Sequence, residues 1–475
     1  MLNIFKHFDY DIVIVGGGSA GLFGAFRIQN LLPKGIKVLL LEKTGSLGNK
    51  LCLSGNGQCN YTNATDMINF QNRYGEKGKF LKKALSQLSN NSLIEMFQSY
   101  GLDSIIRDDG KVFPKSLKAV DIRNLLIEVA KQYPVEIKLN SEVINIDYKP
   151  DSIILEISHF KEKINITTKY LILCTGGASF TKTGSTGDIL RLLKKYQILT
   201  HPFKPALAVP KVKLLYKESF STNDFSSLSG ITLKNARLSI QKKGIGLIRL
   251  PDSQGNLRYP DESRVNPTLP HRRRAKNLNI DMTTNGALLF THTGLSGPLI
   301  LDNSRYCEVG DKIRIYLTQF DRVNELEEYV LELIEQFPKR KMANILNQLD
   351  IPSRLLDFLL GDEFTEIKAA ELSKMNRKKI CNKLHYVEFL IVGIDDIENA
   401  MCSKGGVEVS ELHRSSMMLK KLPNIFLAGE CIDIDGDTGG YNIHAAFATI
   451  NLIVLNLQKL IVNPARIRTK WRKKI

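Results

Sequence analysis

Residues 10–42 read YDIVIVGGGSAGLFGAFRIQNLLPKGIKVLLLE, and this stretch decides the fold. Its first part, residues 11–15, is a short apolar run typical of a buried parallel strand. Gly16, Gly18 and Gly21 follow with the spacing G-x-G-x-x-G. In such a loop the first glycine permits a tight turn, the second lets the backbone approach a pyrophosphate, and the third lets the next helix pack on the strand. The stretch therefore predicts a strand, a helix and a second strand that bind a dinucleotide.

The rest of this stretch supplies partners for the two ends of an adenosine diphosphate. Ser19 and Ala20 open the predicted helix, whose free N–H groups favour a pyrophosphate. Residues 38–41 form the second strand, and Glu42 at its end can accept hydrogen bonds from a ribose diol. Because a carboxylate repels a 2′-phosphate, this site disfavours a phosphorylated nicotinamide cofactor. Lys43 is assigned to the same site.

Two distant apolar segments favour FAD over NAD as the dinucleotide. Residues 170–177 read YLILCTGG, and residues 424–430 read NIFLAGE. Both are similar to strands that end beside FAD in flavoproteins of the glutathione reductase type. Thr175 and Gly176 are therefore assigned to the cofactor, and so are Gly429 and Glu430, with the Glu430 carboxylate near the ribitol and pyrophosphate.

A glycine-rich turn follows the second of these segments. Residues 431–442 read CIDIDGDTGGYN and lead into an apolar run, residues 443–455, that is typical of a helix. With Asn442 as its cap, the N-terminus of this helix would face the flavin pyrimidine, where reduced flavin carries negative charge. The alternative is an ordinary surface turn. The residues assigned to the flavin here are Asp437, Gly440, Tyr441 and Asn442.

Five longer motifs resemble one bacterial flavoprotein family, usually labelled NAD(P)/FAD-dependent oxidoreductases. They are LSGNGQCNYTN (53–63), DGKVFPKSLKA (109–119), TGGASFTKTGSTGD (175–188), GALLFTHTGLSGP (286–298) and AGECIDIDGDTGGYN (428–442). The family includes proteins described as aminoacetone oxidases and a proposed reductase of bile-acid breakdown. The resemblance covers nearly the whole chain and implies an FAD-dependent oxidoreductase.

The chain departs from this family at two points. The family usually has Gly-Arg-Cys-Asn where residues 57–60 read GQCN, and an aromatic-Pro pair where Phe180 and Thr181 stand. Loss of the arginine removes a fixed positive charge near the predicted flavin, which leaves the substrate class open.

Further residues are assigned to the cofactor. Val143 is expected to contact the adenine with its backbone, and five residues are expected on the flavin side. Those on the flavin side are Lys50, Ser54, Gly55, Asn56 and Asn60.

The predicted fold class is α/β, with a glutathione-reductase-type FAD-binding Rossmann domain. Alternating apolar residues at Ala236, Leu238 and Ile240 predict an inserted antiparallel, barrel-like domain. After residue 324 the period becomes helical, which predicts a small helical domain. The expected boundaries are 1–204 and 391–463 for the FAD-binding domain, 205–323 for the barrel-like domain, 324–390 for the helical domain and 464–475 for a basic tail.

The predicted activity is FAD-dependent hydride transfer to or from a small molecule. No second complete G-x-G-x-x-G unit is present, so NAD(P)H would serve as a diffusible electron donor. Two alternatives stay open: a flavin-dependent enzyme that modifies RNA such as tRNA, and a flavoprotein that uses FAD structurally to bind a partner. His292 is the candidate proton carrier, with a structural histidine as its alternative. No metal is predicted, because the calcium-like spacing from Asp433 lacks the required glycine and glutamate.

Charge and cysteine usage bear on partners and compartment. The net charge is +17, which could serve a nucleic acid or an acidic membrane, although a solvated surface explains it too. Basic clusters lie at 271–276, 338–341, 375–379 and 466–474. Seven cysteines without a C-x-x-C pair suggest reduced thiols and a cytoplasmic location. We expect no membrane span and no signal peptide, because apolar runs are short. The oligomeric state is open.

Overall fold

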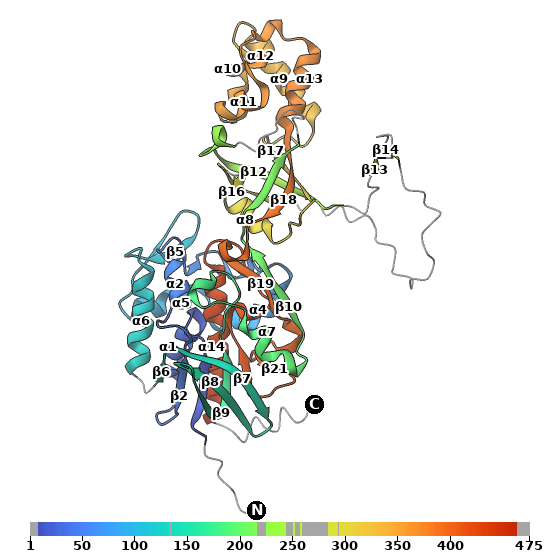
Figure 1. The fold of residues 1–475 in the computed structure, drawn as a ribbon. Coiled ribbons are helices and arrows are strands. Elements are labelled where there is room, and N and C mark those ends of the chain that lie inside the picture. Colours follow the sequence, from blue (N-terminus) through green and yellow to red (C-terminus); the bar gives the residue numbers. More distant parts are fainter. Residues whose placement is uncertain are drawn as a thin grey trace, which may run out of the picture. The chain divides into compact units, whose positions relative to one another are not determined.

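The computed structural model describes residues 8–132, 135–215, 225–243, 250–251, 257–258, 284–292 and 294–462 (Figure 1). The basic clusters predicted at 271–276 and 466–474 lie outside these residues. The chain divides into two compact units: Met1–Ala208 with Asp396–Ile475, and Val209–Asp395. Each unit has its own hydrophobic core.

The first unit is built on a sheet whose centre is parallel. The strands lie in the order β6, β2, β1, β9 and β22, and every neighbouring pair in this series is parallel. These are β6 (Val135–Lys138), β2 (Val38–Leu41), β1 (Tyr10–Val15), β9 (Glu162–Leu173) and β22 (Ile425–Leu427). The last four residues of β1 and of β9 and all residues of β2 and β22 are buried, as expected for strands covered on both faces. Two short antiparallel strands, β21 (Met418–Leu419) and β20 (Leu412–His413), extend the edge beyond β22.

Strand β9 begins eight residues before the apolar segment that starts at Tyr170. It is continuous over Glu162–Leu173 because no turn-forming residue interrupts it. Its first half pairs antiparallel with β8 (Ser152–His159), and its second half pairs parallel with β1. Strand β8 pairs in turn with β7 (Ser141–Lys149), so β7, β8 and the first half of β9 form an antiparallel unit.

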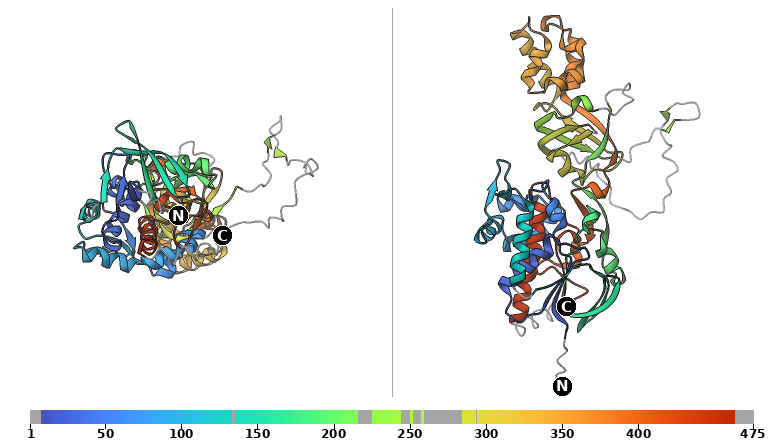
Figure 2. Two further views of the ribbon diagram at one scale, coloured as in Figure 1. Left: turned by 90° about the horizontal axis from the view of Figure 1, so that it is seen from below. Right: turned by 60° about the vertical axis from the view of Figure 1, so that its left-hand side comes forward.

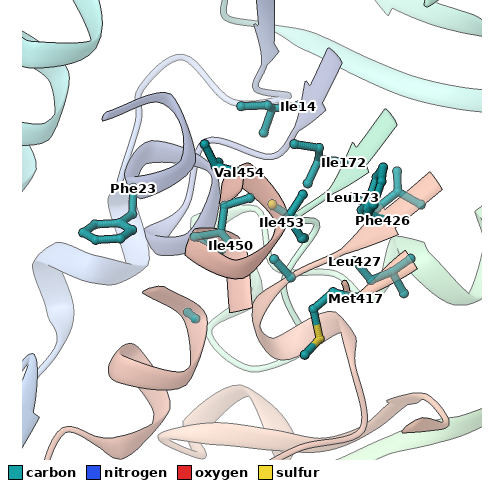
Figure 3. Close-up of a cluster of buried hydrophobic side chains, with 14 of the residues drawn as sticks. Ile14, Phe23, Ile172, Leu173, Met417, Phe426, Leu427, Ile450, Ile453 and Val454 are labelled. Atoms are coloured by element: carbon teal, nitrogen blue, oxygen red, sulfur yellow. The ribbon is translucent and has the colours of Figure 1, made fainter. Parts of the chain in front are cut away.

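Helices α1 (Ser19–Leu31) and α14 (Tyr441–Val462) pack side by side, although they come from opposite ends of the chain (Figures 1 and 2). A Cβ added to Gly24 would lie 2.7 Å from the Ile450 side chain, so a glycine allows this close contact. Ile14, Phe23, Ile450 and Val454 pack in the core beside these helices (Figure 3). Helices α4 (Gly78–Gln87) and α6 (Ala119–Gln132) add to this layer.

Helix α14 is, among the described residues, the one helix long and apolar enough by length and composition to cross a membrane. Its most apolar 18-residue window has a mean hydropathy of 1.7, and 61% of that window is buried inside the protein.

Short elements surround the ends of the parallel strands. They are α2 (Asn49–Leu53), β3 (Thr62–Asn63), α3 (Met67–Asn72), α5 (Asn90–Ser99), β4 (Ser104–Ile106), β5 (Lys111–Pro114) and α7 (Asp188–Leu193). Strands β3, β5 and β4 form a small antiparallel sheet. Strands β10 (Thr200–Ala206) and β19 (Cys402–Val407) pair antiparallel, one before and one after the second unit in the sequence.

The second unit holds a closed antiparallel barrel in the order β11, β16, β15, β12, β17 and β18 (Figure 2). The strands are β11 (Pro210–Leu214), β12 (Thr232–Gln241), β15 (Thr284–Thr291), β16 (Gly294–Ser296), β17 (Lys312–Tyr316) and β18 (Tyr386–Ile394). Its helices are α8 (Pro298–Ser304), α9 (Val323–Gln336), α10 (Met342–Leu346), α11 (Ser353–Leu360), α12 (Asp362–Thr365) and α13 (Lys374–His385). Residues 386–390, assigned by sequence to the helical domain, belong to barrel strand β18.

Candidate dinucleotide site

The glycines of the loop between β1 and α1 have two roles: two are required by packing, and one leaves space for a ligand. A Cβ added to Gly16 would lie 2.3 Å from the Cys174 carbonyl oxygen, and one added to Gly21 would lie 1.9 Å from the Gly16 oxygen. These two glycines are therefore required by packing. A Cβ added to Gly18 meets nothing within 4 Å, so the second glycine faces open space. Approach of a ligand to the backbone explains a glycine there.

Helix α1 presents an uncapped N-terminus at this loop. Gly18 is the N-cap residue, no side chain caps the helix, and no acidic residue lies in the first turn. The first N–H groups of a helix have no partner within it, and they carry the positive end of its dipole. The start of α1 is therefore suited to a pyrophosphate.

Glu42, directly after β2, is buried and held beside the glycine loop. Its Oε2 accepts a hydrogen bond from Gly17 N at 2.7 Å. Its Oε1 accepts bonds from the Thr44 backbone N and from Thr44 Oγ1, both at 2.8 Å. These bonds fix the carboxylate at the position where the sequence expects the adenosine ribose.

The Lys43 side chain binds residues of the protein, and its assignment to the cofactor stays a prediction. Its Nζ lies 2.5 Å from Asp188 Oδ2 and 2.6 Å from Thr186 Oγ1. Both partners belong to the loop that follows β9, residues 174–187, and to the start of α7. The ammonium charge of Lys43 is thus neutralised by Asp188, and the side chain anchors this loop beside Glu42.

Glu430 is the centre of a polar cluster drawn from four distant segments. Its Oε2 lies 2.6 Å from Lys50 Nζ. Its Oε1 accepts from the Ser403 backbone N at 2.7 Å, from Ser403 Oγ at 2.8 Å and from Ser179 Oγ at 3.2 Å. Burial raises the pKa of this carboxyl, but Lys50 and the Ser403 hydrogen bonds outweigh it, and the pKa is lowered. Glu430 is therefore ionised at neutral pH.

Thr175 and Gly429 connect this cluster to the glycine loop. The Thr175 backbone N lies 3.3 Å from a Cβ added to Gly16, and the Ala20 Cβ lies 3.2 Å from one added to Gly429. The hydroxyl of Thr175 is buried without a hydrogen-bond partner in the structure. Since buried hydroxyls are normally paired, this hydroxyl is available to a group bound at the loop. Gly176, with φ +72°, follows in the left-handed region.

The loop after α2 has an unusual backbone. Gly55, Asn56, Gly57 and Cys59 all have positive φ, between 56° and 81°. Such conformations in residues other than glycine cost free energy and cluster at ligand sites. Burial raises the pKa of the Cys59 thiol to about 12, so this cysteine is a neutral packing group.

The side chains of this loop mostly bind the protein itself. Asn60 is buried, and its Nδ2 donates to the carbonyls of Thr62 at 2.9 Å and Val112 at 3.0 Å. Ser54 Oγ donates to the Leu51 carbonyl. At Gln58, where the resembling family has arginine, Arg107 Nη2 donates to Gln58 Oε1 at 2.7 Å. Arg107, which lies between β4 and β5, thus brings a guanidinium group to Gln58.

The turn before α14 corrects one prediction. Asn442 does not cap the helix, which begins one residue earlier, at Tyr441. The Asn442 side chain instead accepts from Gly436 N at 2.7 Å and donates to Gly436 O at 2.9 Å, so it closes the turn. Gly440, with φ +94°, precedes the helix, and its carbonyl accepts the first helical bond from His444 N.

Two neighbours of Asn442 also have structural contacts. The Tyr441 ring is buried against Phe70, and its hydroxyl lies 3.0 Å from Thr65 Oγ1. The carboxylate of Asp437 lies 3.6 Å from Arg73 Nη1.

Two further predicted residues are Val143, in the first unit, and His292, in the second. Val143 is buried in β7, where its carbonyl accepts from Arg191 Nη2 at 3.3 Å. His292 is exposed in the turn between β15 and β16 of the second unit. Among the described residues, no contact of His292 supports its role as a proton carrier.

Sequence reasoning missed four polar residues of the site. Ser179, Thr186 and Asp188 lie within the motif TGGASFTKTGSTGD, so a signal for them was present. Ser403 had none, because only the packing of β19 against residues 429–432 brings it to Glu430. Its hydroxyl also accepts from Ala178 N at 3.0 Å.

The described residues also bring together one group with metal-ligand chemistry, His201, Glu408 and Asp433. An ammonium is already present there, because Lys77 Nζ lies 2.8 Å from Asp433 and 3.5 Å from Glu408. We therefore assign no metal to this group.

Comparison with known proteins adds to this geometry. The HI0933-like protein Rossmann domain matches residues 10–453. The chain is 25% identical to a ribosomal RNA dihydrouridine synthase of Haemophilus influenzae over 94% of this chain and 98% of that protein. A protein of the same name from Escherichia coli is 24% identical, over 93% and 96%. A 3-dehydro-bile acid delta(4,6)-reductase of Clostridium scindens is 22% identical, over 92% and 96%. The last relative confirms the bile-acid part of the predicted resemblance, whereas the aminoacetone oxidase part stays a prediction.

Proposed function

We propose, from the premise that the chain belongs to the HI0933-like Rossmann family, that it reduces a carbon–carbon double bond conjugated to a carbonyl group, in a uracil base of RNA. The predicted class, an FAD-dependent oxidoreductase, is confirmed by the family and by the reductase among its relatives. The substrate and the electron donor are the parts that we propose.

The observation that carries the proposal is the convergence of three segments on the glycine loop and the start of α1. Glu42 binds Gly17 of the loop, Thr175 follows the strand that packs on Gly16, and Gly429 packs on Ala20. FAD would place its pyrophosphate on the start of α1, its adenosine ribose on Glu42, and its ribitol and flavin near Thr175 and Glu430. The open space at Gly18 and the orphaned Thr175 hydroxyl fit such a ligand.

The proposed reaction follows from chemistry that the relatives' names share. Dihydrouridine is uridine with two hydrogens added across its ring double bond, and a delta(4,6)-reductase removes double bonds from a 3-oxo steroid. In both cases FAD, when bound and reduced by NAD(P)H, would supply a hydride to a carbon made electrophilic by a carbonyl, and a proton completes the addition. The nicotinamide leaves oxidised, so electrons balance.

Two observations favour RNA as the substrate. Both relatives named for ribosomal RNA are slightly more similar to this chain than the bile-acid reductase is. The net charge of +17 also suits a polyanion. A small molecule with a conjugated carbonyl is the second candidate, which the bile-acid reductase supports. NAD(P)H as a diffusible donor is part of the proposal.

The location proposed for this activity is the cytoplasm. All seven cysteines are free thiols in the structure, and six of them are buried. Free thiols agree with a reducing compartment.

The first test asks for the cofactor. The purified protein, supplemented with FAD during refolding, should be yellow, and the denatured supernatant should contain FAD. The Glu42→Ala variant should bind FAD more weakly by roughly 1.5 to 3 kcal/mol, because hydrogen bonds to a charged group are lost. Absence of flavin, or FMN without FAD, would contradict the proposal.

The second test asks for the substrate. Protein-free ribosomal RNA, made by transcription so that it lacks modifications, is incubated anaerobically with the protein and NADH or NADPH. We expect a uridine that gains the mass of two hydrogens. If RNA stays unreduced while a 3-oxo-4,6-diene steroid is consumed, the small-molecule candidate replaces RNA.

A further inference from the structure

Helix α13 (Lys374–His385) has the sequence KMNRKKICNKLH, which contains five basic residues and no acidic one. Ile380, Cys381 and Leu384 form its buried side, at 0–1% exposure in the core of the second unit. Arg377 lies on the same side, where its Nη2 is 3.3 Å from Glu327 of α9. Packing therefore fixes which side of α13 faces outward.

The outward side of α13 is lined by lysine. Lys374, Lys378 and Lys379 are exposed, and so are Met375 and Asn382. Within the part of the chain that the structure describes, these three lysines form no ion pair. We call the set Lys374, Met375, Lys378, Lys379 and Asn382 the α13 face.

This arrangement of charge opposes helix stability. Lys374 and Lys378 are four residues apart, as are Lys379 and Lys383, and like charges at this spacing each destabilise a helix by roughly 0.2–0.5 kcal/mol. Acidic residues are instead concentrated on the neighbouring helix α9, where Glu328, Glu332 and Glu335 are exposed. The two signs are thus separated on adjacent helices rather than interspersed.

We propose that the α13 face binds the phosphate backbone of RNA, an inference that rests on the proposed function. Lysine ammoniums are flexible point charges that suit phosphates regardless of base sequence. Their unpaired state leaves the full charge for a polyanion. Lys339–Lys341, which the sequence grouped with these lysines, differ, because Lys341 pairs with Glu366 and Arg340 stacks on Phe337.

An anionic membrane fits the α13 face less well. A helix that lies on a membrane inserts an apolar side beside its lysines. The apolar side of α13 is already buried in the second unit, and Met375 is the one large apolar side chain that its outward side exposes. Charge without apolar area favours RNA.

The test compares two variants of the FAD-loaded full chain. The first, Lys374→Gln with Lys378→Gln and Lys379→Gln, removes three positive charges. The matched control, Glu328→Gln with Glu332→Gln and Glu335→Gln, removes three negative charges from the same helical group. Binding of protein-free ribosomal RNA is measured between low and high salt. Each phosphate contact contributes about 0.7 to 0.9 to the slope of log affinity against log salt.

We expect the lysine variant to bind RNA more weakly and its slope to become shallower by about 2 to 3, corresponding to three lost contacts. The acidic control should keep or increase affinity. Both variants should retain FAD content, and neither should melt below the wild type, since the lysine variant also loses like-charge repulsion; this excludes misfolding. Unchanged affinity and slope in the lysine variant would overturn the proposal. Loss of binding to anionic lipid vesicles with RNA binding unchanged would overturn it in favour of a membrane.

Failure of this inference can be told apart from failure of the proposed function. If wild-type protein forms no dihydrouridine but the lysine variant still loses RNA affinity and slope, the α13 face stands and the proposed reaction falls. If dihydrouridine forms equally in both proteins and the slopes agree, the reaction stands and the α13 face does not bind RNA.

Discussion

In the glycine loop, substitution of one glycine should affect protein stability, whereas substitution of another should affect ligand binding. Gly16 has φ +101° and no room for a Cβ, so Gly16→Ala should destabilise the protein. Gly18 has φ −77°, which alanine adopts freely, and open space around it. Gly18→Ala should therefore keep the melting temperature of the FAD-free protein and weaken FAD binding, because a methyl group occupies the space for the pyrophosphate.

Fluorescence titration with FAD and thermal melts of the FAD-free protein measure this pair. Gly393→Ala in the second unit is the matched control, since its Cβ would meet only the Lys211 side chain at 3.4 Å. Normal FAD affinity in Gly18→Ala would show that no ligand approaches this backbone.

His444 gives a residue-scale prediction for pH. It is fully buried, with Nδ1 2.8 Å from Thr62 Oγ1 and Nε2 3.0 Å from the Leu88 carbonyl oxygen. Burial lowers its pKa from 6.5 to about 4, although the hydrogen bond to Leu88 opposes this shift. The unfolded chain thus binds the proton more readily. The stability from neutral His444 is complete above about pH 6.5 and is lost as pH falls toward 4, by about 3 kcal/mol.

Urea unfolding at pH 7, 5.5 and 4.5 measures this loss. His444→Gln, which keeps a donor and an acceptor, should show a smaller loss over the same range. The pKa of His413 is also lowered by burial, so His413 contributes in the same pH window, and the difference between wild type and His444→Gln isolates the part due to His444. Equal pH dependence in both proteins would exclude His444 as the cause.

At the scale of elements, the loop between β9 and α7 connects the two acidic residues of the site. Ser179 contacts Glu430, and Asp188 pairs with Lys43 beside Glu42. A Cβ added to Gly184 would lie 3.7 Å from Glu42 Oε1. If FAD spans from Glu42 to Glu430, this loop holds it at both ends, and breaking the Lys43 pair should speed FAD release.

Lys43→Met and Asp188→Asn should each raise the FAD dissociation rate by up to about fivefold, since a partly exposed ion pair contributes roughly 0–1 kcal/mol. Stopped-flow transfer of FAD to an excess of an apoflavoprotein measures the rate. The control is Lys341→Met, which breaks an exposed pair with Glu366 in the second unit. An unchanged rate in both loop variants would show that the loop does not retain FAD.

The turn before α14 shows that the choice of a test substitution depends on the tertiary contacts of an element. Stiffening this turn with Gly440→Val would be a natural way to probe the flavin potential. A Cβ there would lie 2.6 Å from the Thr62 carbonyl oxygen, and φ is +94°. The variant would disturb β3 itself, so a change in potential could not be assigned to the turn.

At the scale of the whole molecule, the second unit is an insertion with adjacent ends. Asp395 N donates to the Val209 carbonyl at 3.0 Å, and β10 pairs with β19 in the first unit. The two hydrophobic cores consist of different residues. A chain in which a short Gly-Ser linker replaces residues 210–394 should therefore fold and bind FAD, but lose the RNA affinity that depends on α13.

Flavin absorbance and RNA binding of this shortened chain check the prediction. FAD-loaded protein with full RNA affinity would place RNA binding on the first unit. A shortened chain that folds but binds no FAD would show that the second unit contributes to the cofactor site.

The sequence by itself determined the Rossmann part of the site. The motif consists of turns and strand ends that are a few residues long, so it can be recognised from the spacing of Gly16, Gly18, Gly21 and Glu42. The alternation of apolar and polar residues in barrel strand β12 is likewise a local pattern that can be recognised from the sequence. The helix after the last glycine turn was also readable, because an apolar run preserves its pattern whatever it packs against.

Only the tertiary structure decided which polar groups share the site. Ser403 reaches Glu430, Arg107 reaches Gln58 and Asp188 reaches Lys43 across gaps of 27, 49 and 145 residues. Asn442 binds Gly436 rather than the helix end, and Tyr441 packs inside. A hydrogen bond between distant residues depends on how strands pair and helices pack, and those energies are summed over the whole fold. No local pattern records them, whereas turn geometry is a property of a few consecutive residues.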